Sequence, residues 1–206
     1  EVDYDAWEAV ALSLVSDDET ARSLKEAIRL VDVNVQAFSV RGEQFEDINV
    51  QVQPEPEAWL ITAHNTMLSG MLRIPDNEAP WVANLEYLRF PAIPERTPEE
   101  AAAAEAEDLL EEVDPTQLPA FDFRTAELSI GDSDLGELRF ELQPSDFGAQ
   151  IRHFWLLDDE ARISDQAEQE GANLDWEYRN GFHSSRFTGV LVTGDLARVM
   201  PEWGHD

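Results

Sequence analysis

Four histidines are the first residues to test for chemistry, because the chain contains no cysteine. The absence of cysteine excludes disulfides, thiolate metal sites and cysteine nucleophiles. None of His64, His153, His183 and His205 has a second histidine or a carboxylate at the spacing of a metal-binding helix such as H-E-x-x-H. We therefore expect these histidines to be structural or surface residues.

Other catalytic and metal-binding motifs are also missing. The sequence has no G-x-S-x-G nucleophile elbow and no glycine-rich phosphate loop. The stretch "GDSDLG" at 131–136 places two acids at calcium-like spacing, but Gln143 stands where a bidentate glutamate would fall. This stretch is more typical of a hairpin turn. We expect no catalytic residue, no metal and no cofactor, and therefore no enzyme.

The charge balance excludes two classes of partner. Forty-four Asp and Glu residues face fourteen Lys and Arg, which gives a net charge of -30. Nucleic acid and anionic membrane surfaces are bound through Lys and Arg, so such a surface repels both. No apolar run approaches the ~18 residues of a transmembrane helix. The chain begins with Glu1, which suggests a piece of a longer polypeptide whose targeting elements lie elsewhere.

Helical signals are confined to three places. Apolar residues recur at helical spacing through 1–30, where Ser16 and Glu19 have the spacing of a capping box. Residues 94–119 hold a run of alanine and glutamate that predicts a solvated acidic helical linker. A short helix is expected to start near Asp195.

The rest of the chain alternates apolar and polar residues, and one segment of it is repeated. Residues 31–54 and 121–144 align without a gap, with apolar residues at matching alternate positions. This period of two predicts the same antiparallel β-hairpin in both places. A change of parity predicts a bulge near Ala37. We expect a first β repeat over 31–93 and a second over 120–206.

A repeated hairpin with one apolar face cannot bury that face alone, so repeats stack into a longer sheet. Alternating strands of this kind are more often the core of an ordinary sandwich, and the residues alone favour a sheet with a helical or second-sheet cover. The alternative is a long, twisted and curled sheet whose open apolar side forms a groove suited to acyl chains. Both fold classes are mainly β with some helix.

Three phrases carry a family resemblance. "AWLITAHNTMLSGMLRIP" followed by "PWVANLEYLRFP", "LPAFDFRTAELSIGDSDLGELRFELQP", and "RFTGVLVTGDLARVMPEWG" resemble recurring strands of the YhdP branch of AsmA-like bacterial envelope proteins. The resemblance covers most of residues 31–206, and the acidic stretch falls where that family has a linker. It implies a large periplasmic protein, anchored in the inner membrane outside this chain and similar to TamB and other bridge-like lipid transfer proteins.

Together with the repetition, the resemblance favours the long, twisted and curled sheet over the sandwich. It also implies a function without chemistry, in which the β-groove carries phospholipid between the inner and outer membranes. The expected partners are phospholipid acyl chains, neighbouring repeats of the same polypeptide and other envelope proteins. The alternative is a structural or adaptor module of the envelope with a closed β core. The residues expected to face lipid, chosen from strand parity, are Ile48, Val50, Val52, Leu138, Phe140, Leu142, Leu174 and Trp176.

Overall fold

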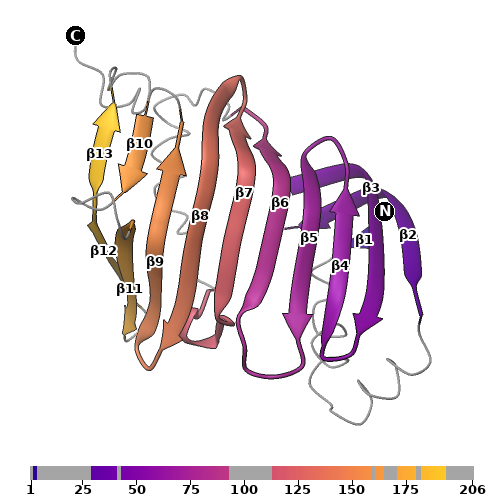
Figure 1. Cartoon of the computed structure of the whole chain (residues 1–206), viewed down its shortest axis with the longest axis horizontal. Helices are drawn as coiled ribbons and strands as arrows, with labels where there is room; N and C mark the ends of the chain where they lie inside the picture. Colours follow the sequence, from indigo (N-terminus) through magenta and orange to yellow (C-terminus); the bar gives the residue numbers. More distant parts are fainter. Residues whose placement is uncertain are drawn as a thin grey trace. The chain divides into compact units, whose positions relative to one another are not determined.

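The computed structural model describes residues 2–3, 29–40, 43–92, 113–158, 161–164, 171–179 and 182–193. These residues are mainly β, as the sequence predicts. The chain divides into two compact units, Glu1–Leu88 (unit 1) and Arg89–Asp206 (unit 2). Each unit is described by itself below, and the strand labels follow Figure 1.

Unit 1 is built on an antiparallel meander in which consecutive strands pair (Figure 1). A short first strand pairs in parallel with the second, through Val2↔Phe38 and Asp3↔Ser39. The strands are β1 (Val2–Asp3), β2 (Val31–Val40), β3 (Glu43–Glu55), β4 (Ala58–His64), β5 (Leu68–Pro75) and β6 (Trp81–Phe90).

Unit 2 starts with a second antiparallel meander and then forks. One edge of β9 pairs with β11 near its start and with β10 near its end, and these two continue to β12 and β13. The strands are β7 (Phe121–Ile130), β8 (Ser133–Ser145), β9 (Gly148–Leu157), β10 (Ala161–Ser164), β11 (Ala172–Arg179), β12 (Phe182–Thr188) and β13 (Val190–Thr193).

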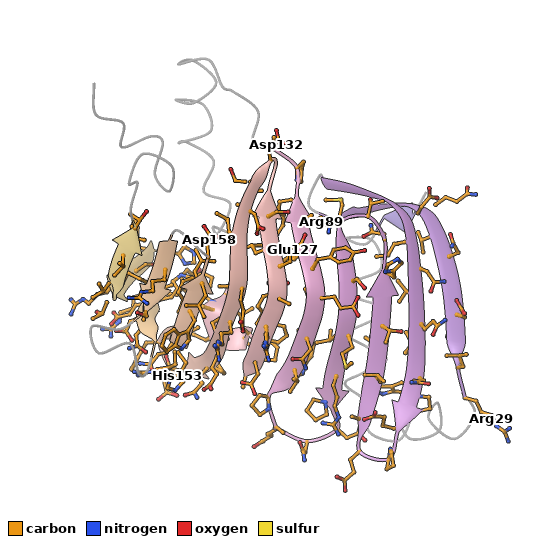
Figure 2. The ribbon with its side chains drawn as sticks, turned by 45° about the horizontal axis from the view of Figure 1, so that its top comes forward. Arg29, Arg89, Glu127, Asp132, His153 and Asp158 are labelled. Carbon is orange, nitrogen blue, oxygen red and sulfur yellow. The ribbon has the colours of Figure 1, made fainter. Side chains whose placement is uncertain are left out.

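The last two residues of β6 belong to unit 2, where they contact the β7–β8 hairpin. The Phe90 carbonyl accepts a hydrogen bond from the Gly131 amide at 2.9 Å. The Arg89 guanidinium donates to the Glu127 carboxylate at 2.8 Å, and both side chains are labelled in Figure 2. Both are about half exposed, at 47% and 46%, so solvent weakens this ion pair.

The predicted repeat is confirmed in its strand register. Val31 pairs with Val52 in the first hairpin, and Phe121 pairs with Leu142, each ninety positions later, in the second. The third strands follow the same rule, because Glu55↔Ala58 corresponds to Ser145↔Gly148. The sequence similarity therefore reflects a repeated three-strand unit, in which equivalent residues face the same side of their sheet except where the bulges of the second copy, near Thr125 and at His153, change the alternation.

The bulge predicted near Ala37 is wrong. The β2–β3 register runs from Val31↔Val52 to Val40↔Glu43 without a shift. The shift occurs instead at the equivalent place of the second hairpin, between Thr125 and Leu128. There the Thr125 hydroxyl is fully buried and donates to the Glu127 carbonyl at 3.0 Å, which satisfies a backbone group that the bulge removes from the ladder.

The predicted helices fall largely outside the described residues. Of segment 1–30, only the two-residue strand β1 and residues 29–30 are described. Of linker 94–119, residues 113–119 are described and contain one 3-10 turn, Pro115–Gln117, capped by Asp114. The C-terminal helix expected near Asp195 also lies outside them.

The buried apolar side chains of the described residues are mostly small. Those under 9% exposed are four alanines, Pro115, Ile48 at 7% and Leu128 at 8%. A closed sandwich of this size would bury many large aliphatic and aromatic side chains. Here most of the large apolar residues are only half-buried and lie on a single side of the sheet in each unit.

Candidate functional site

One side of the unit 1 sheet is apolar from β2 to β6. Because side chains alternate and paired residues share a side, the register defines the rows directly. One row runs Val31, Val52, Ile61, Leu72 and Ala83, and the next runs Val33, Val50, Ala63, Gly70 and Leu85. We call this side the apolar face of unit 1; Trp59 and Ile74 extend it beside Pro54.

The other side of unit 1 is mostly polar and is called its polar face. A row beside the apolar ones runs Asp32, Gln51, Thr62, Met71 and Asn84. The next row includes Asn49, His64, Ser69 and Tyr87. The sheet of unit 1 therefore separates an apolar surface from a hydrogen-bonding one across a single layer of backbone.

The apolar face of unit 2 has the same construction but is largely aromatic. The register brings Phe123 beside Phe140 and Leu142 beside Ile151 and Leu174. A row of phenylalanine rings crosses the strands, with centroids 5.0 Å apart for Phe123–Phe140 and 6.5 Å apart for Phe140–Phe154 and Phe154–Phe187. Offset rings at these distances attract one another beyond the burial of their area.

A bulge keeps the aromatic row on one side. The β8–β9 register shifts between Arg139 and Glu141, opposite His153, whose φ is 51°. The extra residue lets Phe154 lie with Phe140 on the apolar face, while His153 lies 4.0 Å from the Glu141 carboxylate on the polar one. Trp155 also lies on the polar face, 5.6 Å from the Arg139 guanidinium.

The eight residues expected from parity to face lipid lie on these two faces. Ile48, Val50 and Val52 share the apolar face of unit 1; Leu138, Phe140, Leu142, Leu174 and Trp176 share that of unit 2. Ile48 differs from the other seven, because it is 7% exposed and has little surface left for a ligand. Sequence reasoning missed Trp59, Ile61, Leu72, Phe123, Phe154 and Phe187, although the alternation in "AWLITAH" pointed to the first two.

The histidines occupy separate places. His183 accepts a hydrogen bond from the Trp176 indole at 3.1 Å and stacks on Tyr178. His64 lies 3.1 Å from the Ser69 hydroxyl, and His205 is outside the described residues. Within the described ranges no three His, Cys, Asp or Glu residues gather as a metal site would require. The "GDSDLG" stretch forms a turn, in which Asp134 accepts from the Gly136 amide at 2.9 Å.

These features define a class: a protein of repeated β-hairpins whose sheets have one apolar and one polar face. The chain belongs to the YhdP protein family, whose family model matches residues 1–206. No curated protein and no solved structure matches the chain. Among the residues that the structure describes, no helix is long and apolar enough to cross a membrane.

Proposed function

We propose that this chain is a periplasmic segment of an inner-membrane-anchored envelope protein whose apolar β faces carry phospholipid between the inner and outer membranes. The observation that supports this most is the unbroken apolar face in each unit, whose large side chains stay half-buried. Val31 and Val33, at one margin of the face of unit 1, are 38% and 44% exposed, and Phe187 of unit 2 is 52% exposed. Membership of the YhdP family favours the same function.

The proposed mechanism is passive. Acyl chains lie against the aliphatic rows of unit 1 and the aromatic row of unit 2, where each methylene removed from water contributes about 0.8 kcal/mol. A tail of ordinary length is therefore held by apolar area alone, and neighbouring rows offer similar area, so that a lipid can slide. Headgroups stay in water at the margin of each apolar face.

No covalent step is part of this function, and we assign the chain no catalytic residue and no cofactor. Its partners are phospholipid acyl chains and neighbouring repeats of the same polypeptide, which would continue the sheet at its edges. Other envelope proteins are the partners proposed for the polar faces. The net charge of -30 keeps the polar faces solvated and repels nucleic acid.

Site-specific photo-crosslinking tests the proposal. A diazirine amino acid is placed at Val50 or at Phe140, with Gln53 and Glu141 as controls on the polar faces, in cells that make the protein at its natural length. Phospholipid adducts at the first two positions and not at the controls would support lipid carriage. Adducts at none of the four, with the protein correctly folded, would favour a structural or adaptor module with a closed core.

A further inference from the structure

A polar hollow in unit 1 lies on the side of the sheet opposite the proposed lipid face. It has a volume of about 340 Å³ and is lined by residues from four consecutive strands, β3 to β6. The side chains used below are Asn49, Gln51, Thr62, His64, Ser69 and Glu86, of which His64 and Glu86 are exposed; Ala63, Gly70 and Met71 complete the lining. Because acyl chains on the apolar face cannot reach through the backbone, this hollow needs an explanation of its own.

A bulge in β6 creates one wall of the hollow. Ser69 pairs with Tyr87 while Gly70 pairs with Leu85, so Glu86 is an extra residue in its strand. Gly70 makes this possible, since a Cβ there would come 2.4 Å from the Asn84 carbonyl oxygen. Bulges re-aim side chains and are common beside binding sites. Here the bulge directs the Glu86 carboxylate at Ser69.

The hydrogen bonds among Ser69, His64 and Glu86 determine which of their atoms donate and which accept. The Ser69 hydroxyl donates to Glu86 Oε2 at 2.8 Å, and its oxygen lies 3.1 Å from His64 Nδ1. Ser69 is only 6% exposed, and its single proton is already committed to Glu86. His64 Nδ1 is therefore the donor to Ser69.

The opposite wall is oriented by Asp32. Its two carboxylate oxygens accept from Asn49 Nδ2 and Gln51 Nε2, both at 2.9 Å. This leaves the carbonyl oxygens of the two amides as the acceptors that Asn49 and Gln51 can offer to the hollow, which they line together with Thr62.

The chemistry of this lining selects a cation that donates hydrogen bonds. No Lys or Arg is among the lining residues, and the nearby Arg73 pairs with Glu55 at 3.0 Å. One carboxylate and several oriented acceptors complement an ammonium group, which has three donors and no acceptor. The strongly negative field of the chain concentrates small cations at such a hollow.

We infer that the hollow on the polar face of unit 1 is a binding site for a primary ammonium group, carried by a small organic molecule. Glu86 supplies the charge, and the oxygens of Asn49 and Gln51 fix the orientation. A free amine and the headgroup of an aminophospholipid share this chemistry. The free amine is favoured, because the phosphate of a headgroup would lie beside Glu86 with no cation to balance it.

The test uses the whole chain and NMR titration of backbone amides, with ethanolamine as the probe. We expect saturable shifts at Ser69, Gly70 and Glu86, with a Kd of about 10 mM or tighter. Ethylene glycol, the neutral counterpart, and glycerophosphoethanolamine, the headgroup form, should each bind at least tenfold more weakly. Equal binding of ethylene glycol would overturn the assignment of an ammonium site, and preferred binding of the headgroup form would overturn the choice of a free amine.

Matched variants separate the site from the general charge of the protein. Glu86→Gln removes the carboxylate charge and keeps the side-chain shape, and Glu78→Gln removes the same charge in the exposed turn before β6. Ethanolamine binding should weaken at least tenfold in the first variant and stay within twofold in the second. Equal loss in both variants, or unchanged binding in both, would overturn the proposal. Unchanged amide spectra elsewhere in unit 1 show that the variants fold.

Discussion

Truncating Phe140 to alanine tests whether the apolar face of unit 2 is open. The Phe140 ring contacts three other rings, at centroid distances of 5.0 Å to Phe123 and 6.5 Å to Phe121 and Phe154. In a closed core, removing a phenylalanine costs about 3–5 kcal/mol of unfolding free energy. Phe140 is only half-buried, so we expect about half of that, roughly 2 kcal/mol, most of it from the lost ring contacts.

Leu128→Ala provides the comparison, because Leu128 lies in the same hairpin and is 8% exposed. Although leucine is the smaller side chain, its removal from a buried position should cost at least as much as the removal of Phe140, about 2–5 kcal/mol. Urea denaturation of the whole chain measures both, with the m-value showing that the same transition is observed. A loss of about 4 kcal/mol or more for Phe140→Ala, exceeding that of Leu128→Ala, would refute an open face.

Three further perturbations test the fold. Gly136→Ala should lower the free energy of unfolding by about 2–3 kcal/mol, because Gly136 has a φ of 73° and an added Cβ would lie 2.0 Å from the Leu157 carbonyl oxygen. A melting temperature within about 1 °C of that of the unchanged protein would contradict this. Thr125→Val should cost about 1 kcal/mol in urea titrations, because the Glu127 carbonyl loses its buried donor, and a stabilised variant would show that this bond is unimportant. Raising NaCl from about 0.01 M to 0.5 M should raise the melting temperature by screening repulsion among forty-four acids, and a fall would contradict the role given to net charge.

The repeat and the parity of its strands could be predicted from the sequence, because both depend on local alternation. Val31, Val33 and Val35 share a side with their partners on β3 as predicted, and the second hairpin repeats the pairing. Whether such a face is covered could not be predicted, since alternation is the same in a closed sandwich and an open sheet. Ile48 is buried while Val33 is exposed, although both belong to the same alternating pattern. This difference depends on neighbouring side chains, which the alternation does not describe.

Bulges were the least predictable feature. The parity change after Val35 suggested one near Ala37, yet that hairpin keeps a regular register and its counterpart near Thr125 does not. The bulge at Glu86 leaves no clear trace in "WVANLEYLRF", because it arises where β6 passes close to Gly70 of β5. The polar hollow depends on that bulge and on four strands, so no single stretch of sequence reveals it.

The central claim, that acyl chains lie on the apolar face, is tested most directly by tryptophan quenching with brominated phospholipid. Trp176 lies on the apolar face of unit 2 and Trp155 on its polar face, so single-tryptophan variants that retain one or the other report the two sides of one sheet. We predict that lipid with brominated tails quenches Trp176 and leaves Trp155 unchanged, relative to the same lipid without bromine. Equal quenching of both, or quenching of Trp155 alone, would contradict lipid binding to the apolar face.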